Sequence, residues 1–154
     1  MESAMTNKLF WPLIAGVIGG FFGNGVLGVI FTSPPIQSVL YDPEIQSQLF
    51  IDITPIRNVP VSVAGLVVLS AIHGWLFSIL YPSLPGNNWL KKGLFWGLVI
   101  WSMYWLFQEW FIYNTLLGEP LILNLLELVI LAVGSMVEGI IISFLLVKWR
   151  KVVA

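Results

Sequence analysis

The side chains of this chain that could do chemistry are five polar groups set within long apolar stretches. They are Asn24, His73, Glu109, Glu127 and Glu138. Carboxyl and imidazole groups take up and release protons, and both can bind cations. Ionisable groups are costly inside a membrane and usually mark a proton relay, an ion path or a ligand site. We therefore expect these five residues to form a polar layer or a path for protons or ions.

Counting from the ends of the apolar stretches divides these residues into two layers. Glu109 and Glu127 each lie nine residues from Gly118, so a tight turn there places both at one depth. The same count places His73 near the midplane, about 14 Å from the opposite surface. The predicted outer layer holds Asn24, Glu109 and Glu127, and the predicted middle layer holds His73 and Glu138. In the outer layer, two adjacent carboxyl groups could not both be ionised.

A second interpretation of His73 is contact with a planar cofactor. Small residues flank the histidine, so a flat macrocycle could approach the helix backbone. Trp101, Tyr104 and Trp105 are expected at bilayer depth, where they could stack on a ring. One histidine cannot supply both axial ligands of a haem. His73, Trp101, Tyr104 and Trp105 could thus contact a haem, a chlorophyll-type pigment or a quinone, whereas plain packing of the aromatic rings is the alternative.

Catalytic and metal-binding motifs are missing from the sequence. The chain has no cysteine, and it shows no Ser-His-Asp set, phosphate loop or nucleotide fingerprint. Glu109, Glu127 and Asn124 could hold one hard cation. Di-metal sites in helix bundles use Glu-x-x-His pairs, which are absent here. We predict no catalytic residue and no metal centre; enzyme activity stays open, and a non-enzymatic role is favoured.

Composition indicates an integral membrane protein. Of the 154 residues, 58% are hydrophobic and 10% are charged, whereas soluble domains carry about 25% charged residues. The predicted fold class is all-α, a single transmembrane domain built as an up-down-up-down four-helix bundle. Its four spans are predicted at about 9–31, 61–82, 93–117 and 121–147.

The last span, 121–147, should organise the bundle. It is about 40 Å long as a helix, enough to cross a hydrocarbon core of about 30 Å. Glu127 and Glu138 leave the same face about 16 Å apart, and Asn124 and Ser135 widen that face. Because a carboxylate facing lipid is costly, the other helices are expected to cover this face.

Glycines in the first span predict a close helix–helix contact. Gly16, Gly19, Gly20 and Gly23 form overlapping pairs four residues apart, which let another backbone approach. A contact with another helix of this chain is the favoured interpretation. A homodimer or another subunit is the alternative partner for this face.

The long connection at 32–60 is predicted to carry a short amphipathic helix. Asp42 and Pro43 suit its first positions, and Thr54–Pro55 would end it. Its apolar residues recur every four positions, at Ile45, Leu49 and Ile53. Long connections in small proteins are often functional.

Basic residues set the expected orientation. Six of the seven lysines and arginines fall on one side of the four-span arrangement, and only Arg57 falls on the other. The positive-inside rule then places both termini in the cytoplasm and the 32–60 connection outside, in a plasma or inner membrane.

These observations predict a non-catalytic membrane protein that acts as a subunit of an oligomer or larger membrane complex. The expected partners are the lipid bilayer and other membrane subunits or a second copy. A net charge of −1 argues against nucleic acid. The alternative is a small transporter or channel for protons or cations that uses the intramembrane Glu and His residues.

Overall fold

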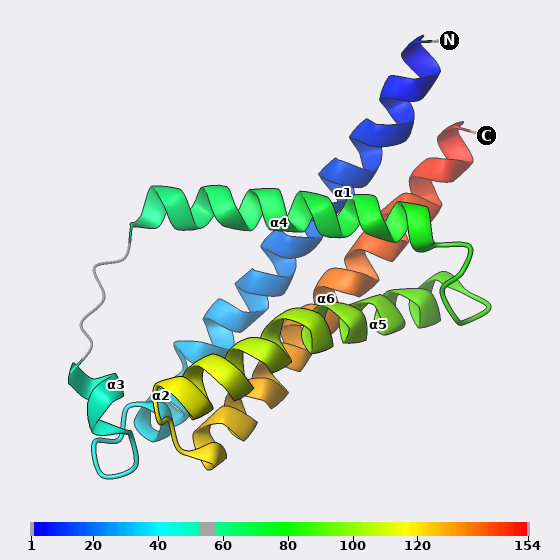
Figure 1. Ribbon diagram of the computed structural model, residues 1–154. Coiled ribbons are helices and arrows are strands. Elements are labelled where there is room, and N and C mark those ends of the chain that lie inside the picture. Colours follow the sequence, from blue (N-terminus) through cyan, green and yellow to red (C-terminus); the bar gives the residue numbers. More distant parts are fainter. Residues whose placement is uncertain (1, 53–57, 154) are drawn as a thin grey trace.

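The computed structural model describes the backbone of residues 2–52 and 58–153, and side chains within 9–148. The all-α prediction is confirmed, since every regular element in the described parts of the chain is a helix. The three long helices are α1 (Glu2–Phe31), α4 (Val59–Leu80) and α6 (Leu121–Val153) (Figure 1). Three segments are long and apolar enough to cross a membrane, namely Leu9–Phe31, Val59–Leu80 and Leu121–Lys148. The chain therefore has the helices of a membrane protein.

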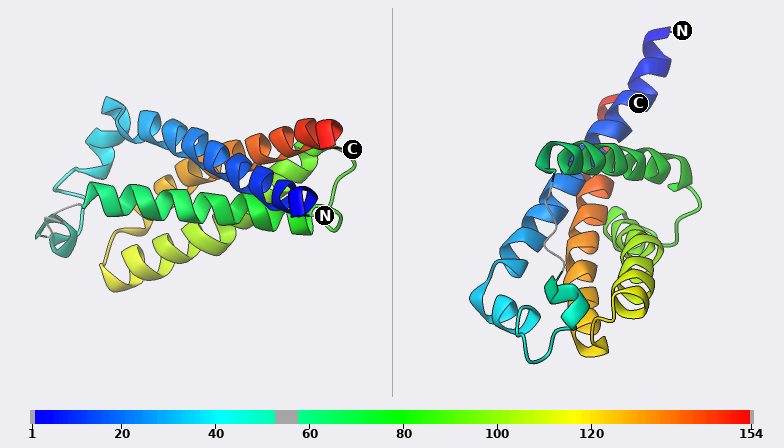
Figure 2. Two further views of the ribbon diagram at one scale, coloured as in Figure 1. Left: turned by 90° about the horizontal axis from the view of Figure 1, so that it is seen from above. Right: turned by 60° about the vertical axis from the view of Figure 1, so that its left-hand side comes forward.

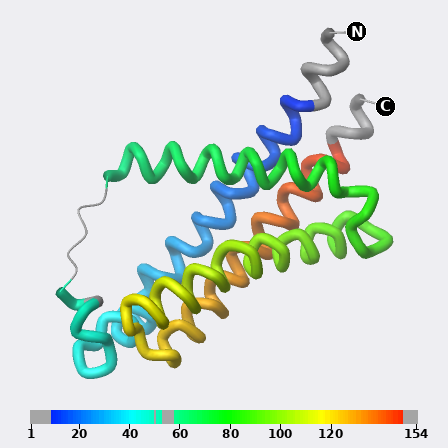
Figure 3. Tube along the Cα trace, in the orientation of Figure 1, coloured from blue at the N-terminus to red at the C-terminus, as the bar shows by residue number. Residues whose placement is uncertain are grey.

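The predicted span at 93–117 is not one regular α-helix. It consists of α5 (Trp89–Ile100) followed by two π-helical segments, η1 (Trp101–Trp105) and η2 (Gln108–Leu116). The chain follows one continuous helical path through all three (Figure 3). The wider turns are closed by bonds such as that from the Leu117 amide to the Ile112 carbonyl, at 3.0 Å. Wider turns change the direction in which later side chains leave the helix, and π-segments often occur at functional sites.

The predicted up-down-up-down four-helix bundle is not confirmed, because α4 is not packed along its length like the other helices. Helix α6 packs against α1 on one side and α5 on the other, whereas α4 packs mainly against α1. Helix α4 lies across α1 and α6 rather than along them (Figures 1 and 2). Only Ser70, Gly74 and Phe77 of α4 are buried, so its first half separates from the other helices.

Glycines explain this crossing. A methyl group built on Gly16 would overlap the backbone of Ser70 and of Gly74 in α4, and one built on Gly20 would overlap the Ser70 side chain. The backbones of α1 and α4 are therefore in direct contact, as small residues permit. Gly19 and Gly23 lie on a neighbouring face of α1 and approach α6, where the backbone of Gly134 is one of the neighbours. All four glycines thus pack within the chain.

A second glycine pair joins α5 to α6. A methyl group on Gly97 would meet the Ser135 carbonyl oxygen at 2.6 Å, and Gly139 lies against Gly97 in turn. The Ser143 hydroxyl also donates a hydrogen bond to the Trp89 carbonyl at 2.7 Å. This contact fixes α6 between two helices and explains its central place in the fold.

The connection between α1 and α4 differs from its prediction. It contains α2 (Pro34–Leu40) and α3 (Gln48–Asp52). The predicted start at Asp42 is wrong: the Asp42 carboxyl group accepts the Glu44 amide at 2.9 Å as a helix cap would, but the chain forms only one turn there, and α3 begins at Gln48. The predicted end of that helix, with Ile53 and Thr54–Pro55, lies outside the described residues.

Both termini lie at the same end of the molecule, together with the turn at 81–88 (Figures 1 and 2). Helices α2 and α3 and the turn at 117–120 lie at the opposite end. The side of the membrane that each end faces remains a prediction from the basic residues.

Candidate functional site

The first polar site is a group of three carboxyl groups and one amide, which we call the carboxylate cluster. It comprises Glu109 of η2, Glu119 of the following turn, and Glu127 and Asn124 of α6. One oxygen from each glutamate lies within 4.8 Å of the other two. Glu109, Glu119 and Asn124 are buried, with exposed fractions of 1%, 2% and 0%.

The turn at Gly118 brings these side chains together. Gly118 adopts a positive φ of 71°, a conformation that glycine adopts at little cost. The turn returns the chain alongside itself, so Glu109 and Glu127 come to one level, in accordance with their equal separation from Gly118. The Asn124 amide donates to Glu119 Oε2 and, at 3.4 Å, to Glu109 Oε2. Asn124 of α6 thus links the turn to η2 and to α6.

The connection after α2 closes over the cluster. Gln46 donates a hydrogen bond to Glu119 Oε1 at 3.2 Å. The Ser47 hydroxyl donates to the Leu117 carbonyl at 3.0 Å. The cluster is therefore covered from the end of the molecule by residues that lie 70 and 73 positions from their partners in the sequence.

Glu119 is a site residue that the sequence analysis missed. A glutamate between glycine and proline in a turn is ordinarily exposed, and no spacing rule singles it out. Burial raises its pKa from 4.5 to about 7, the negative charge of Glu127 adds to that rise, and hydrogen bonds from Gln46 and Asn124 oppose it. The Glu119 carboxyl group therefore changes its charge close to neutral pH.

The second polar site is a pair formed by His73 of α4 and Glu138 of α6. His73 Nδ1 lies 2.8 Å from Glu138 Oε1. The side chains are 14% and 8% exposed. Gly20 of α1 lies between the two helices that carry the pair. A Cβ on Gly20 would overlap the Ser70 side chain of α4 and would lie 3.7 Å from Glu138 Oε1 of α6. Because Gly20 has no side chain, α4 can come close enough to α6 for His73 to reach Glu138. The predicted middle layer is thus a hydrogen-bonded pair.

This pair lines a cavity of about 420 Å³, which we call the histidine cavity. Its wall is built from α1, α4, α6 and the α5–η1 helix. Tyr104 and Trp105 line it together with His73, so three of the four predicted cofactor contacts share one space. The volume lies within the usual range of ligand pockets, about 300–1,000 Å³. Its other lining residues are Asn24, Ser62, Gly65, Leu66, Leu69, Ser70, Ile100 and Glu138.

Asn24 belongs to the histidine cavity and not to the outer layer, so its predicted layer is wrong. Its amide donates to the Gly20 carbonyl at 2.9 Å, and its side chain lines the cavity with His73 and Glu138. The adjacent Gly23 packs against Glu138. The close approach of α1 to α6 therefore sets the level of Asn24, which a count from the end of α1 does not reveal.

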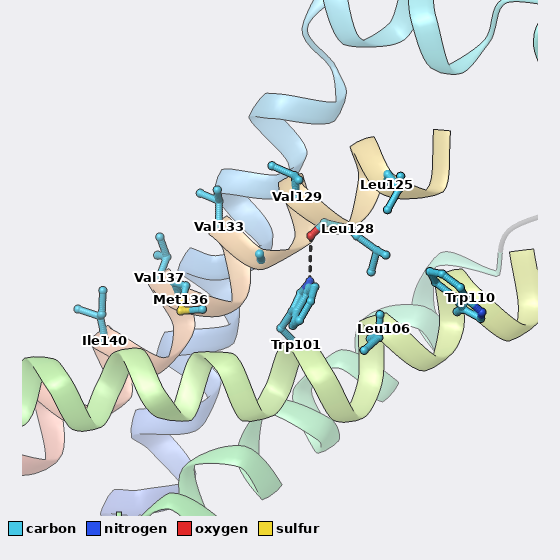
Figure 4. A pocket seen from close by; sticks show the side chains of 11 residues that line it. Trp101, Leu106, Trp110, Leu125, Leu128, Val129, Val133, Met136, Val137 and Ile140 are labelled. Atoms are coloured by element: carbon cyan, nitrogen blue, oxygen red, sulfur yellow. Dashed lines mark hydrogen bonds between the residues drawn. The ribbon is translucent and has the colours of Figure 1, made fainter. Parts of the chain in front are cut away.

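Trp101, the fourth predicted cofactor contact, lies elsewhere. It lines an apolar cavity of about 650 Å³ between the η1–η2 helix and α6, with residues such as Leu128 and Met136 (Figure 4). Its indole nitrogen donates to the Leu128 carbonyl at 2.9 Å (Figure 4). Trp101 therefore braces two helices and does not face His73.

An apolar layer separates the two polar sites. Leu27 of α1 and Ile130 and Leu131 of α6 form a buried group between Glu127 and Glu138, and Trp101 and Trp105 pack against it. Proton transfer needs a chain of hydrogen-bonding groups, and these side chains offer none. Apolar side chains of α1 and α6 therefore lie between the two sites.

Comparison with known proteins finds no family model, no curated protein and no solved structure that matches this chain.

Proposed function

We propose that this chain is a non-catalytic membrane protein that acts as a subunit of a membrane complex and holds a planar cofactor in the histidine cavity. The observation that supports this best is the His73–Glu138 hydrogen bond in the cavity wall. Polar groups beside an open space within a membrane need an occupant, because lipid cannot solvate them.

The geometry of His73 favours a cofactor that contains a metal. A histidine that ligates a metal usually donates its other ring N–H to a carboxylate or carbonyl, which fixes the ring and raises its basicity. His73 already has this arrangement through Nδ1 and Glu138. In the tautomer whose proton is on Nδ1, Nε2 keeps the lone pair that binds a metal. A haem or chlorophyll-type pigment with one protein ligand therefore fits, and a quinone that donates a hydroxyl to Nε2 is the alternative.

Aromatic and small residues complete the cavity. Tyr104 and Trp105 offer ring faces and edges on one side, with their centroids 4.5 Å apart. Gly65, whose added Cβ would meet nothing within 4 Å, leaves the facing part of α4 open. A flat ring can therefore enter between α4 and η1 without displacing backbone.

The first half of α4 supports a subunit role. Its large side chains are exposed, among them Val61 at 65% and Val68 at 59%. Around Gly65 these short branched side chains form a smooth surface that suits a helix of another subunit, since small residues allow close packing between membrane helices. We propose that a partner helix packs there and closes the cavity on its open side. Both termini would face the cytoplasm of a plasma or inner membrane.

Absorbance of the gently solubilised native protein tests this proposal. We expect a visible band that copurifies with the chain and is lost in His73→Leu, because the metal ligand is removed. Ser78→Ala, a change on the same helix outside the cavity, should keep the band. A colourless wild type that releases no quinone into organic solvent would contradict the cofactor assignment.

Proton or cation conduction is the second candidate function, and the three adjacent carboxyl groups favour it. A conducting path would have to cross the apolar layer formed by Leu27, Ile130 and Leu131. We therefore propose conduction only as the second function, after that of a cofactor-binding subunit.

A further inference from the structure

We propose that the carboxylate cluster is a binding site for one hard divalent cation, of which Ca²⁺ fits best. The site lies apart from the histidine cavity and would be filled whether or not that cavity holds a cofactor. Its ligands would be Glu109, Glu119 and Glu127, with the Asn124 side-chain oxygen as the fourth.

The spacing of the carboxyl oxygens matches this ion. Ca²⁺ binds oxygen at 2.3–2.6 Å, so ligands on opposite sides of it are about 5 Å apart. The three carboxyl oxygens of the cluster lie within 4.8 Å of one another. This spacing lets one ion contact all three groups. Mg²⁺ requires an octahedral set of ligands and usually keeps several waters, whereas Ca²⁺ accepts a flexible set of carboxylate and amide oxygens. The buried carboxyl and amide groups of the cluster therefore favour Ca²⁺.

Asn124 provides an independent indication of a ligand. Its side chain is fully buried and projects among the carboxyl groups, where its nitrogen contacts Glu109 and Glu119. Its Oδ1 atom is buried without a hydrogen-bond partner among the described residues. A buried amide oxygen left unpaired costs about 1–3 kcal/mol. A half-turn about the terminal torsion, which is broad and two-fold for amides, would present Oδ1 to a cation between the carboxylates.

The charge balance also favours a cation. Three carboxyl groups are gathered here, and among the side chains that the structure describes the one ion pair is His73–Glu138. Like charges at this spacing either take up protons or bind a positive ion. A divalent ion between these groups would contact the ionised carboxylates and the unpaired Asn124 oxygen together.

The cover over the cluster suits an ion site that is closed from water. Gln46 donates to Glu119 Oε1, and its own oxygen accepts the Ser47 amide at 2.9 Å. This arrangement fixes the Glu119 carboxyl group over Asn124. Through Gln46, the connection after α2 is also linked to the carboxyl group that would bind the ion.

Terbium luminescence of the purified full-length chain, stripped of metal with a chelator, tests the site. Tb³⁺ occupies Ca²⁺ sites and emits when a nearby aromatic residue is excited, and Tyr113 lies one turn from Glu109 in η2. We expect saturable emission at neutral pH that Ca²⁺ displaces at least ten-fold more effectively than Mg²⁺. Glu127→Gln and Glu109→Gln should each weaken binding at least ten-fold.

Two controls make the result decisive. Glu44→Gln removes an exposed carboxylate from the same connection and should leave binding unchanged, and Ser78→Ala should do likewise because Ser78 lies on α4 outside both sites. Wild-type protein without saturable emission would overturn the proposal and leave protons as the only occupants. Equal affinity in wild type, Glu127→Gln and Glu109→Gln would overturn it too, by locating the emission elsewhere.

Discussion

Glu119 is the residue whose surroundings decide how the turn at 117–120 responds to pH. Its carboxyl group is 2% exposed, although it lies in a turn at the end of the molecule. Asn114 donates to its backbone carbonyl at 2.8 Å, while Gln46 and Asn124 hold its side chain. Folding therefore moves a carboxyl group from water to a buried place beside Glu127, and this raises its pKa to about 7.

Replacing Glu119 with Gln should flatten the dependence of stability on pH. In the metal-free protein, the folded chain holds the Glu119 proton up to about pH 7, whereas the unfolded chain releases it near 4.5. Stability contributed by this group is thus full below pH 4.5 and declines as the pH rises toward 7. Thermal unfolding in detergent between pH 4 and 8.5 should show a smaller decline for Glu119→Gln. The same decline in both proteins would mean that Glu119 is not buried.

For single residues, the sequence predicts which side chains a short turn brings to the same level. Glu109 and Glu127 were found together because both lie nine residues from Gly118. Glu119 and Asn24 were not assigned correctly, because their positions depend on contacts from distant segments. The Gln46 side chain covers Glu119, and the approach of α1 to α6 places Asn24 beside Glu138.

Helix α4 is the element that gives the fold its open shape. It contacts α1 through Gly16, Ser70 and Gly74, where no side chain separates the two backbones. Beyond this crossing its first half carries exposed valines and helps to line the histidine cavity. The glycine spacing in the sequence indicates which face is in contact, but glycine pairs permit several crossing angles. The direction of α4 could therefore not be predicted from the pattern.

A leucine at Gly16 should disrupt this crossing. The added side chain would overlap the backbone of Ser70 and Gly74, and overpacking of this kind costs about 1–3 kcal/mol. Gly25→Leu is the matched control on the same helix, because a Cβ there meets nothing within 4 Å. We expect Gly16→Leu to lower the unfolding temperature in detergent and Gly25→Leu to leave it unchanged or raise it. Equal behaviour of the two variants would show that α4 does not contact α1 at this point.

The π-helical segments show a further limit of sequence reasoning about elements. Hydropathy places an apolar stretch at 93–117, but the turns of η1 and η2 are wider than those of an α-helix. The side chains of Trp101 and Tyr104 consequently face different cavities. Counting residues at the α-helical period could not separate them.

The whole molecule is a set of helices around α6 that carries two separate polar sites. Composition and hydropathy are enough to predict the helical class and three of the four expected spans, because apolar length is a local property. The way in which the helices cross depends on contacts between distant glycines, so the four-helix bundle expected from the spans is not confirmed. The carboxylate cluster lies at the turn after η2, and the His73–Glu138 pair lies beside the crossing of α1 with α4.

Native mass spectrometry of the chain, extracted gently from its own membrane, tests the central claim most directly. The bare chain has a mass of 17.3 kDa. A subunit that holds a cofactor should appear at a higher mass, together with at least one partner chain. Collisional activation should release the cofactor from the wild type. The cofactor should be absent from His73→Leu. Gly25→Leu should retain both. A wild-type spectrum that contains only the 17.3 kDa chain would contradict both the cofactor and the subunit role.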